Sequence, residues 1–563
     1  MRWFWPLLFV LHLHAENAPT FTRDVAPILY AHCVGCHHPG GIGPFSLVEY
    51  RDAKKRAKLI ARVTASHYMP PWLPAAGHGE FEGERRLSGE QIAALARWLD
   101  AGAPEGNAKD LPPRPKWSDD WQLGPPDLVL KLSAPYTLPA EGKDVYRNFV
   151  LPVNLPADRY VRAAEIRPGN LRAVHHAFVF VDETNASRAL DAADREPGYP
   201  GMNPGPGAMG PDGHCIAWQP GKRALPEPAG TAWVLHRKSD IVLQLHLRPS
   251  GKRESIQPSI ALYFTDQPPE RDLYTLFIRS PAIDIPAGAQ DYAIEASYTL
   301  PVDADLLSIW PHLHYLGHEI HSWAELPDGT NKELLSIPNW DFNWQGDYRY
   351  THPQPLPKGA RLHLRATYDN TEANPRNPNR PPKRVRYGPE TSDEMGELFF
   401  QFLPRNRADR NALMRDYTEK YALADSLAVA QALLERDPRD AASRTQLGTT
   451  LIVLGRLEEA EKELQRAIQD NPSLALAHYA LSSIYMARND AGRAEAALLR
   501  TLELDPNHSD AHNDLGNVYL FENDIPAAIA QLEEALRLNP NDTLAQSNLA
   551  KARARLPAPA TPK

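Results

Sequence analysis

The chain has 563 residues, which is too long for a single hydrophobic core and predicts three or four domains. Its formal net charge of −9 argues against a nucleic-acid-binding surface, so no nucleic-acid partner is expected. Its three cysteines, Cys33, Cys36 and Cys215, are too few for a disulfide scaffold.

Residues 1–15 have the pattern of an export signal peptide. Arg2 supplies a positive charge, residues 3–13 are mostly apolar, and residues 13–15 form a candidate cleavage site. A buried N-terminal helix is the alternative interpretation. The apolar run is too short to span a bilayer and no later run is long enough, so no transmembrane segment is expected. The expected location is therefore periplasmic or secreted.

Residues 16–112 are predicted to form a small all-α domain. Ser88 is a favourable N-cap residue, and Gln91 follows in the first turn of the last helix. A proline-rich linker at 112–115 ends the domain. The candidate helices cover 22–31, 50–65 and 88–101.

A haem-attachment motif lies within this domain, because residues 33–37 read Cys-Val-Gly-Cys-His, a C-x-x-C-H sequence. Thioether bonds from Cys33 and Cys36 would attach one covalent haem c, and His37 would ligate its iron. A zinc or thiol-redox site is the alternative for this motif. Zinc would need two further ligands, and Cys215 is far along the chain.

The second axial ligand of the haem is expected to be Met69. This methionine lies in a proline-bounded loop, and its thioether would raise the reduction potential. His67 and His38 are rival candidates for the same position. The surrounding sequence resembles class I cytochromes c, which implies a cytochrome c-like fold for residues 16–112.

From residue 117 to about 405 the pattern changes to that of β-strands. Residues 243–247, for example, alternate leucine with polar side chains. The 54 prolines of the chain, roughly twice ordinary usage, favour short strands and many turns. The length of the region predicts two all-β sandwich domains, at 117–266 and 267–405.

Two histidine motifs in this region have the spacing of metal ligands. His312 and His314 form an H-x-H pair, and both imidazoles can reach one metal ion because residues i and i+2 of a strand share a face. Met395 is a candidate third ligand with a soft thioether. A His₂Met set prefers copper, especially Cu(I), to zinc or magnesium.

The other motif is the adjacent pair His175-His176, which precedes an apolar run. Adjacent strand residues point to opposite faces, so this pair can share a metal ion only across a twist or a bulge. His246 is a candidate third ligand that would complete a His₃ set.

Other histidine and aromatic side chains of the region are expected to be structural. The alternation of Trp340, Phe342 and Trp344 predicts a packed strand face. The remaining histidines are expected to be hydrogen-bonded surface or core groups rather than ligands, namely His318, His321, His352 and His363.

From residue 411 the chain is helical and repetitive, with a period of 34 residues. The recurring positions are Pro438, Pro472, Pro506 and Pro540, and the small residues Gly448, Ser482 and Gly516. This pattern resembles tetratricopeptide repeats, which place small residues where two paired helices touch. Residues 411–556 are therefore expected to form an all-α solenoid with a capping helix from 541, and to bind a protein or peptide partner.

Four stretches of the β-rich region together resemble the copper type II, ascorbate-dependent monooxygenases, the family of the peptidylglycine and dopamine monooxygenases. Their order and approximate spacing match across about half of the chain. The stretches are Val174-His175-His176, Leu243-Gln244-Leu245-His246, His312-Leu313-His314 with Gly317, and Ser392-Asp393-Glu394-Met395.

The resemblance implies two jelly-roll sandwich domains that each hold one copper ion, so two copper ions in all. The implied electron-transfer ligands are His175, His176 and His246, and the implied ligands of the catalytic copper are His312, His314 and Met395. The implied reaction inserts one oxygen atom of O₂ into a substrate C–H bond and reduces the other atom to water.

The sequence departs from the family at Trp310, two residues before the H-x-H pair, where the peptidylglycine enzymes have an arginine that binds the substrate carboxylate. A tryptophan offers an apolar face and one N–H donor, so a small apolar or aromatic substrate is expected. A core position for Trp310 is the alternative. The family's domain disulfides are also missing, and Cys215 is expected to be a small buried residue beside a surface histidine, His214.

Three functions remain open from the sequence. The leading one is an exported copper-dependent monooxygenase that receives electrons from an external donor through its fused haem. The second is a non-catalytic haem and copper electron carrier, or a copper-binding protein, that its repeats dock to partners. The third is a scaffold in which the repeats dominate and the redox domains have degenerated.

Overall fold

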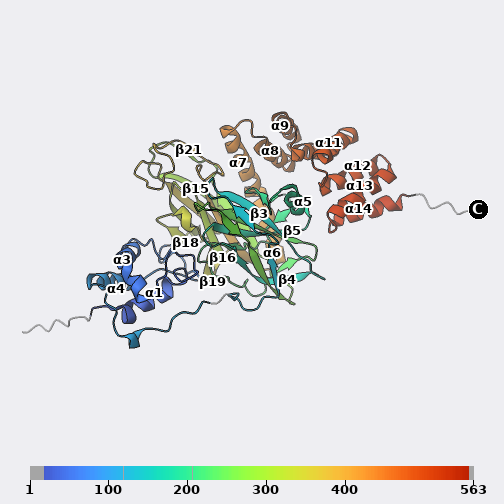
Figure 1. Cartoon of the computed structure of the whole chain (residues 1–563). Helices are drawn as coiled ribbons and strands as arrows, with labels where there is room; N and C mark the ends of the chain where they lie inside the picture. Colours follow the sequence, from blue (N-terminus) through green and yellow to red (C-terminus); the bar gives the residue numbers. More distant parts are fainter. Residues whose placement is uncertain (1–17, 118–119, 206, 557–563) are drawn as a thin grey trace, which may run out of the picture. The chain divides into compact units, whose positions relative to one another are not determined.

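The computed structural model describes residues 18–117, 120–205 and 207–556 (Figure 1). These residues fall into two compact units. The first runs to Trp72 and resumes at Glu84, whereas the second comprises Leu73–Gly83 and the chain from Asp120 onward. The expected signal peptide at 1–15 lies outside the described residues. Among the described residues, no helix has both the length and the apolar character needed to cross a membrane.

The first unit is helical. Its elements are η1 (Phe21–Val25), α1 (Ala26–His32), α2 (Tyr50–Lys55), α3 (Ala57–Ala65), α4 (Gly89–Asp100) and η2 (Ala108–Asp110). The predicted N-cap of α4 is confirmed, because the Ser88 hydroxyl accepts from the Gln91 N–H and the Gln91 side chain accepts from the Ser88 N–H. The single helix predicted over 50–65 is wrong: Arg56, at φ −113° and ψ 9°, leaves helical geometry and separates α2 from α3.

The core of this unit brings η1, α1 and α4 together. Phe21, Leu29 and Trp98 are almost completely buried, and the rings of Phe21 and Trp98 lie 6.3 Å apart. Cys33, which ends α1, packs against the same cluster of apolar side chains. The C-x-x-C-H segment therefore starts in contact with the core of the helical unit.

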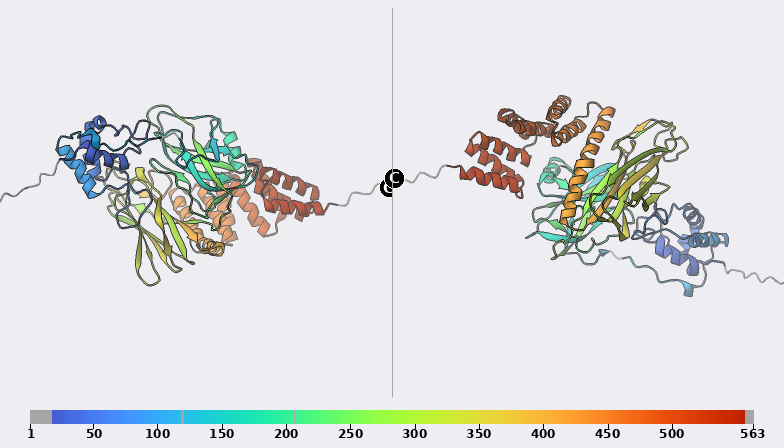
Figure 2. Two further views of the ribbon diagram at one scale, coloured as in Figure 1. Left: turned by 90° about the horizontal axis from the view of Figure 1, so that it is seen from below. Right: turned by 180° about the vertical axis from the view of Figure 1, so that it is seen from behind.

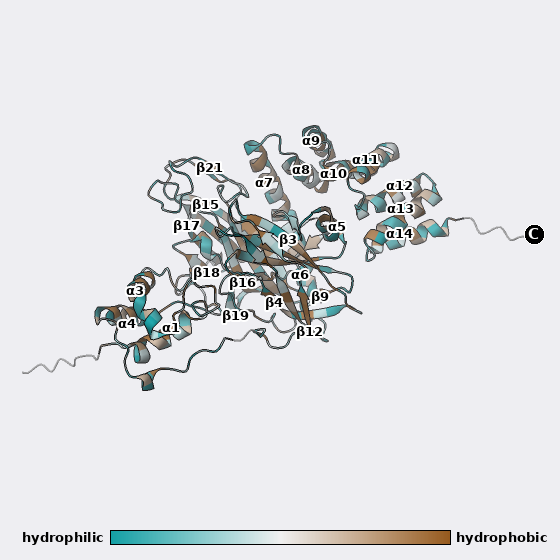
Figure 3. Cartoon of the chain, in the orientation of Figure 1, coloured by the Kyte–Doolittle hydropathy of each residue, from teal (hydrophilic) through white to brown (hydrophobic). Residues whose placement is uncertain are grey.

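The second unit begins with two antiparallel sheets and a short helix. The elements are β1 (Leu128–Lys131), β2 (Tyr136–Leu138), β3 (Val145–Pro152), β4 (Arg159–Arg167), β5 (Val174–Asp182), α5 (Ala186–Ala193), β6 (Tyr199–Pro200), β7 (Ala208–Met209), β8 (Ala217–Trp218), β9 (Trp233–Leu235), β10 (Asp240–Leu247), β11 (Glu254–Ile256) and β12 (Ser259–Thr265). One of the larger sheets has the order β1-β12-β4-β9, and the other has β6-β3-β10-β5-β7 with β8 beside β5. Strands β2 and β11 pair with each other in a separate two-stranded sheet. Leu243 and Leu245 of β10 share a buried core with Ile260 and Leu262 of β12, so the sheets pack face to face. Figure 3 shows apolar stretches along strands such as β4 and β12.

A second pair of sheets follows along the chain. The elements are β13 (Tyr274–Arg279), β14 (Asp284–Ile285), β15 (Tyr292–Thr299), β16 (Ala304–Leu313), β17 (Gly317–Glu325), β18 (Asn331–Ile337), η3 (Phe342–Trp344), β19 (Tyr348–Leu356), β20 (Arg361–Tyr368), β21 (Val385–Arg386) and β22 (Gly396–Pro404). The orders of the two larger sheets are β13-β22-β16-β19 and β15-β20-β17-β18, and β14 pairs with β21 in a separate two-stranded sheet. A side chain at Gly396 of β22 would collide with Ile294 of β15 and Tyr368 of β20, so a glycine lets the two sheets approach.

The strand face predicted from Trp340, Phe342 and Trp344 is wrong. Residues 342–344 form the short 3₁₀ helix η3, and Asp341 caps it by accepting from the Asn343 N–H. The side-chain carboxylate competes with strand pairing at this point, which explains why the alternation of aromatic residues does not produce a strand.

The chain from Arg407 is helical. Its elements are α6 (Arg407–Tyr417), η4 (Thr418–Ala422), α7 (Leu423–Arg436), α8 (Ala441–Val453), α9 (Leu457–Asp470), α10 (Ala475–Ala487), α11 (Ala491–Leu504), α12 (Ser509–Phe521), α13 (Ile525–Leu538) and α14 (Thr543–Ala554). The predicted 34-residue period is confirmed, because α8/α9, α10/α11 and α12/α13 are successive packed pairs. A Cβ atom at Gly448 would lie 2.6 Å from Cγ of Leu464, and one at Gly516 would lie 2.7 Å from Cγ of Leu532, so small residues are required where the helices touch.

The segment α6–η4–α7 lies along the β-rich region, as the orange helix in Figure 2 shows. Tyr417 and Tyr421 both donate hydrogen bonds to backbone carbonyls of β13, at 2.7 and 3.0 Å. The guanidinium of Arg279 donates to the carboxylate of Asp425 at 2.7 Å and to that of Glu397 at 2.8 Å. The first helix of the repeat region is therefore joined to the sheet that contains β22.

Candidate functional site

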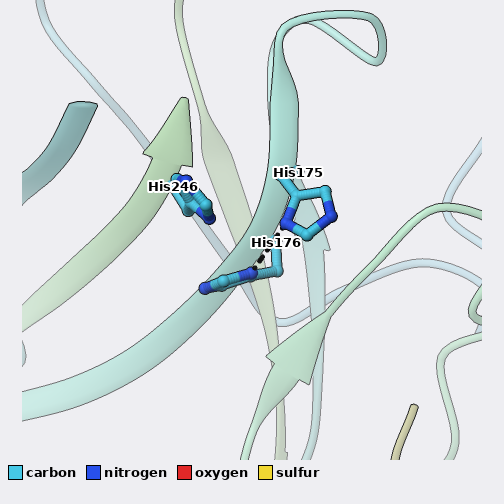
Figure 4. Close-up of side chains that lie close together, drawn as sticks. All are labelled: His175, His176 and His246. Atoms are coloured by element: carbon cyan, nitrogen blue, oxygen red, sulfur yellow. Dashed lines mark hydrogen bonds between the residues drawn. The ribbon is translucent and has the colours of Figure 1, made fainter. Parts of the chain in front are cut away.

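His175 and His176 lie at a β-bulge of β5. His246 of β10 pairs with His176, but the next residue, Leu247, pairs with Val174. His175 is therefore the extra residue of the bulge. The local kink brings adjacent side chains to one side of the strand, as Figure 4 shows.

The three imidazoles of His175, His176 and His246 converge. One nitrogen from each ring lies within 4.8 Å of those from the other two. The ring centroids are 5.3, 5.1 and 4.8 Å apart, and the Nδ1 atoms of His175 and His176 are separated by 3.2 Å. These separations suit three nitrogen ligands around one metal ion.

The environment keeps two of these imidazoles neutral. Burial, together with the neighbouring His246 and Arg248, lowers the pKa of His175 to about 4. Burial and the adjacent His246 also lower the pKa of His176 well below its ordinary value. A metal ligand must be unprotonated, so both rings are ready to bind a metal ion at neutral pH.

Asp144 orients the third imidazole. The Nε2 atom of His246 lies 2.8 Å from Oδ2 of Asp144, and the ring of Tyr146 stacks on it at 4.3 Å. His246 is fully buried, and its other nitrogen, Nδ1, has no hydrogen-bond partner among the described residues. Partial burial opposes ionisation of Asp144, yet the hydrogen bond from His246 holds the carboxyl pKa below its ordinary value. A metal ion at Nδ1 would satisfy an otherwise unpaired buried group, so the residues present fit the group that the sequence implies.

The H-x-H pair lies at the end of β16, with its two rings 5.1 Å apart. The Nδ1 atom of His312 lies 2.5 Å from Oε1 of Gln345, and that of His314 lies 3.0 Å from the Asp393 carbonyl. Both oxygens are acceptors, so each Nδ1 carries the ring proton and each Nε2 can ligate a metal ion. Burial lowers the pKa of His314 to about 3, and His312 contributes to the shift.

The strand register brings Met395 beside this pair. Leu313 of β16 lies opposite Gly396 of β22 in an antiparallel ladder. His314 follows the first residue and Met395 precedes the second, so the two are neighbours across the ladder. The Tyr368 hydroxyl donates to the Met395 carbonyl at 2.9 Å and fixes the backbone there.

Glu394 organises the turn that contains both residues. Its fully buried carboxylate accepts hydrogen bonds from the N–H groups of His314 (2.9 Å), Leu316 (2.6 Å) and Met395 (3.2 Å). Burial outweighs these bonds and raises the pKa of Glu394 to about 8. Glu394 lies in one of the four stretches that resemble the monooxygenases. The structure adds that its carboxylate holds the backbone of His314 and Met395 in place.

Phe342 is a residue of the site that sequence reasoning misses. Its ring stacks on His175 with centroids 6.0 Å apart, and lies edge-to-face with His314 at 5.8 Å. The carbonyl of Phe342 also accepts from the side chain of Gln345, which in turn holds His312. A single short helix, η3, therefore contacts both histidine sets.

Trp310 lies on the same face of β16 as His312, because the two are separated by one residue. Its ring stacks on Phe399 of β22, with centroids 5.3 Å apart and an interplanar angle of 7°. Trp310 is half-buried. The pair forms a flat aromatic surface next to the H-x-H motif.

In the helical unit, the C-x-x-C-H residues lie at the end of α1. Burial raises the pKa of the Cys33 thiol to about 12, whereas a redox-active dithiol needs a lowered pKa. Among the described residues, Cys33 and Cys36 join no group of three or more close metal-ligating side chains. The Nδ1 atom of His37 lies 3.1 Å from the Phe45 carbonyl, which leaves Nε2 as the nitrogen for an iron ion.

The three candidates for the second axial position differ in their surroundings. Met69, which follows α3, is half-buried, whereas His67 is exposed. The ring of His38 stacks on Trp117 at 4.6 Å, and its Nδ1 lies 2.9 Å from the Pro39 carbonyl. The assignment of Met69 as the second axial ligand stays a prediction.

Cys215 and His214 lie outside both histidine sets. Burial raises the pKa of the Cys215 thiol to about 12, which fits an unreactive structural cysteine. The expected surface position of His214 is wrong, because its side chain is buried and its Nδ1 lies 3.0 Å from a carboxylate oxygen of Glu227. The carboxylate of Glu227 places a polar atom beside this buried imidazole.

Comparison with known proteins identifies the C-terminal region. A family model described as "Tetratricopeptide repeat" matches residues 423–475, 445–509, 479–543 and 513–561. No curated protein matches the chain. Among solved structures, two crystal structures of MamA match 25% of this chain at 23% sequence identity and a TM-score of 0.23, and the matches cover 76% and 81% of those chains. The C-terminal helices are therefore tetratricopeptide repeats, an architecture that presents surfaces to protein partners.

Proposed function

We propose that the chain is an exported copper-dependent monooxygenase with two copper ions and one covalent haem c. The observation that carries this proposal is the bulge at His175, which lets adjacent histidines and His246 converge around an unpaired buried nitrogen. His312, His314 and Met395 would hold the second copper ion. The proposal includes a cytochrome c-like fold for the helical unit, two jelly-roll sandwiches for the β-rich region, and a periplasmic or secreted location.

The proposed reaction converts a substrate C–H bond and O₂ into an alcohol and water, and consumes two electrons and two protons. The chemistry that bound copper supplies is one-electron transfer and reduction of dioxygen. Asp144 holds a ring proton on Nε2 of His246 and Gln345 holds one on Nδ1 of His312, so Nδ1 of His246 and Nε2 of His312 would be the nitrogens that bind copper. Burial keeps His176 and His314 unprotonated, so these residues bind the metal without first losing a proton.

The stacked pair Trp310–Phe399 supports a small apolar or aromatic substrate. Its flat face lies beside His312, where a substrate would have to approach the second metal site. The Trp310 ring provides no cation for a substrate carboxylate. We therefore propose that the substrate is held by apolar contact and stacking.

The fused haem is the proposed entry point for electrons. Cys33, Cys36 and His37, with Met69 as second axial ligand, would hold a haem that accepts single electrons from an external donor. The electrons would then pass to the site formed by His175, His176 and His246. Rapid-mixing absorption tests this route, because reduced haem should be reoxidised only when copper is bound.

The repeats would dock a protein or peptide partner, and the electron donor is one such candidate. The paired helices α8 to α13 present an extended surface suited to this role.

The first test is the number of copper ions per covalent haem in protein matured in a haem-loading, oxidising compartment. We expect two copper ions per haem in the parent chain. His246→Ala and His312→Ala should each lose a different one. Near-zero copper after reconstitution would exclude the monooxygenase.

A non-catalytic electron carrier would bind the same metals, so a second measurement is needed. A monooxygenase consumes O₂ when small aromatic substrates are added under reducing conditions, whereas a carrier does not. Phe399→Ala should then weaken substrate-stimulated O₂ uptake while copper content stays at two ions per haem.

A further inference from the structure

A second group of metal-ligating side chains lies on the solvent-facing side of the sheet β15-β20-β17-β18. His321 of β17 and Glu333 of β18 meet there, with His321 Nε2 2.6 Å from Glu333 Oε2. His78 Nδ1 approaches the same oxygen at 3.1 Å. One ligand atom from each of the three residues lies within 4.8 Å of the others.

His78 comes from a distant part of the sequence, Leu73–Gly83, which we name the strap. The strap belongs to the second unit although the chain on both sides of it belongs to the first. Its backbone is bonded at three points. The Ala75 N–H donates to the Ser336 carbonyl at 2.7 Å, the Glu80 carbonyl accepts from the Thr351 N–H at 2.9 Å, and the Glu82 N–H donates to the Arg349 carbonyl at 2.8 Å. His78 lies between the first of these hydrogen bonds and the other two.

An aromatic contact and a glycine fix the strap next to His78. The ring of Phe81 is buried and lies 4.9 Å from Tyr350 and 5.5 Å from Tyr348. Gly79, at φ +112°, is in the region that glycine favours, and a Cβ atom there would lie 2.6 Å from the Phe81 ring. The backbone that carries His78 is therefore held before any ligand binds.

His321 of β17 and Glu333 of β18 are also held in place by their neighbours. Glu333 pairs with Trp323 across β18 and β17, and a register shift follows at Ser322. The rings of His321 and His363 both pack on Trp323, at 5.0 and 4.7 Å. Trp323 thus orients His321 toward the carboxylate of Glu333.

We propose that His78, His321 and Glu333 bind a divalent transition-metal ion of the zinc class. Two imidazole nitrogens and one carboxylate oxygen form a donor set that zinc uses, with the fourth position open to water on the exposed side. The set has no soft sulfur ligand, which distinguishes it from the His₂Met set. The bound ion would replace the hydrogen bonds that His78 and His321 make to Glu333. It would then link the strap to β17 and β18 through its ligands.

The competing explanation is that His78, His321 and Glu333 lie close together only because they hydrogen-bond to one another. A measurement of zinc binding distinguishes this explanation from a metal site. The full chain is stripped of metal and dialysed against zinc at micromolar concentration, and zinc per chain is measured. His78→Ala and His321→Ala should each remove one zinc equivalent. His352→Ala, which removes an exposed histidine from the neighbouring strand β19, should remove none.

Two further tests show whether a variant loses zinc because a ligand is missing or because the chain misfolds. His78→Cys supplies a thiolate ligand and should keep the zinc equivalent that His78→Ala loses. In the parent chain, zinc should slow hydrogen exchange of the Ala75 and Glu82 amides, and it should have no such effect in His78→Ala. The proposal is overturned if zinc content is the same with and without His78, or if zinc leaves strap exchange unchanged.

Discussion

The phenyl ring of Phe342 stacks on the imidazole of His175, with the ring centroids 6.0 Å apart. The same ring meets His314 edge-to-face at 5.8 Å, so one aromatic side chain contacts a histidine of each set. The two sets come from strands far apart in the sequence, and Phe342 contacts both of them.

Replacing Phe342 by alanine should therefore affect both metal sites and the stability of the β-rich region. We expect a loss of about 3–5 kcal/mol in the free energy of unfolding, because a buried phenyl group leaves a cavity. Copper affinity should fall at both sites, as measured by competition with a chelator. Phe402→Ala is the matched control: Phe402 is fully buried in β22, so stability should fall similarly while copper affinity is unchanged. Equal copper affinities in the two variants would show that Phe342 has only a packing role.

Asp144→Asn should weaken copper binding at the site of His246. The carboxylate holds the Nε2 proton of His246 and makes the ring a stronger ligand, and loss of such contacts typically costs about 10–100-fold in metal affinity. Asp158→Asn is the control, because Asp158 bonds His236 in the same way at 2.9 Å but on the surface. A similar copper affinity in Asp144→Asn and the parent would contradict the proposed role.

The metal-free protein should lose stability as the pH falls below about 6.5. The folded pKa values of His175 and His314, about 4 and about 3, lie below the ordinary value of 6.5, so the unfolded chain binds more protons between these limits. Stability should rise with pH across this window and these two groups should contribute no slope above it. Urea unfolding at a series of pH values measures the slope.

The contribution of one histidine can be isolated from that of the carboxylates. His314→Gln removes one titrating group and should reduce the slope between pH 3 and 6.5. A slope in His314→Gln equal to that of the parent would mean that folding does not lower the pKa of His314.

Gly448→Ala should destabilise the repeats, because the new methyl group would lie 2.6 Å from Cγ of Leu464. Overpacking of this kind costs about 1–3 kcal/mol. Gly492→Ala, in α11, is the control, since no atom lies within 4 Å of its new Cβ and alanine favours helix by up to about 1 kcal/mol. Differential scanning calorimetry of the two variants should show shifts of opposite sign. A lower Tm in both variants would indicate that helix propensity and the room for a methyl group do not determine the effect of alanine at Gly448 and Gly492.

The repeats could be predicted from the sequence because their geometry is encoded locally. Each unit contributes the same small residue, such as Gly448 or Gly516, at the same helix contact, so a fixed period is visible along the chain. The change from helical to β-rich sequence was also visible in its periodicity. The boundary between α2 and α3 was not, since the conformation at Arg56 has no clear sequence signal.

The candidate metal ligands could be predicted from the sequence. The bulge and the neighbouring side chains that hold these ligands in place could not. Adjacency of His175 and His176 indicated that a bulge was needed, and only strand pairing shows where it lies. Asp144 and His246 are separated by about 100 residues, and no local pattern connects them. The alternation of Phe342 with two tryptophans is typical of a strand, but the cap at Asp341 starts the 3₁₀ helix η3 there.

The contact between Arg279 and Asp425 determines where the chain can be cut. A fragment that ended at Pro404 would lose the carboxylate of Asp425 and leave a partly buried guanidinium with Glu397 as its remaining acidic partner. It would also uncover the side of β13 on which Tyr417 and Tyr421 lie. The shortest fragment that preserves the β-rich region should therefore extend through Arg436, so the first helix of the repeats belongs physically to the sheets as much as to the array.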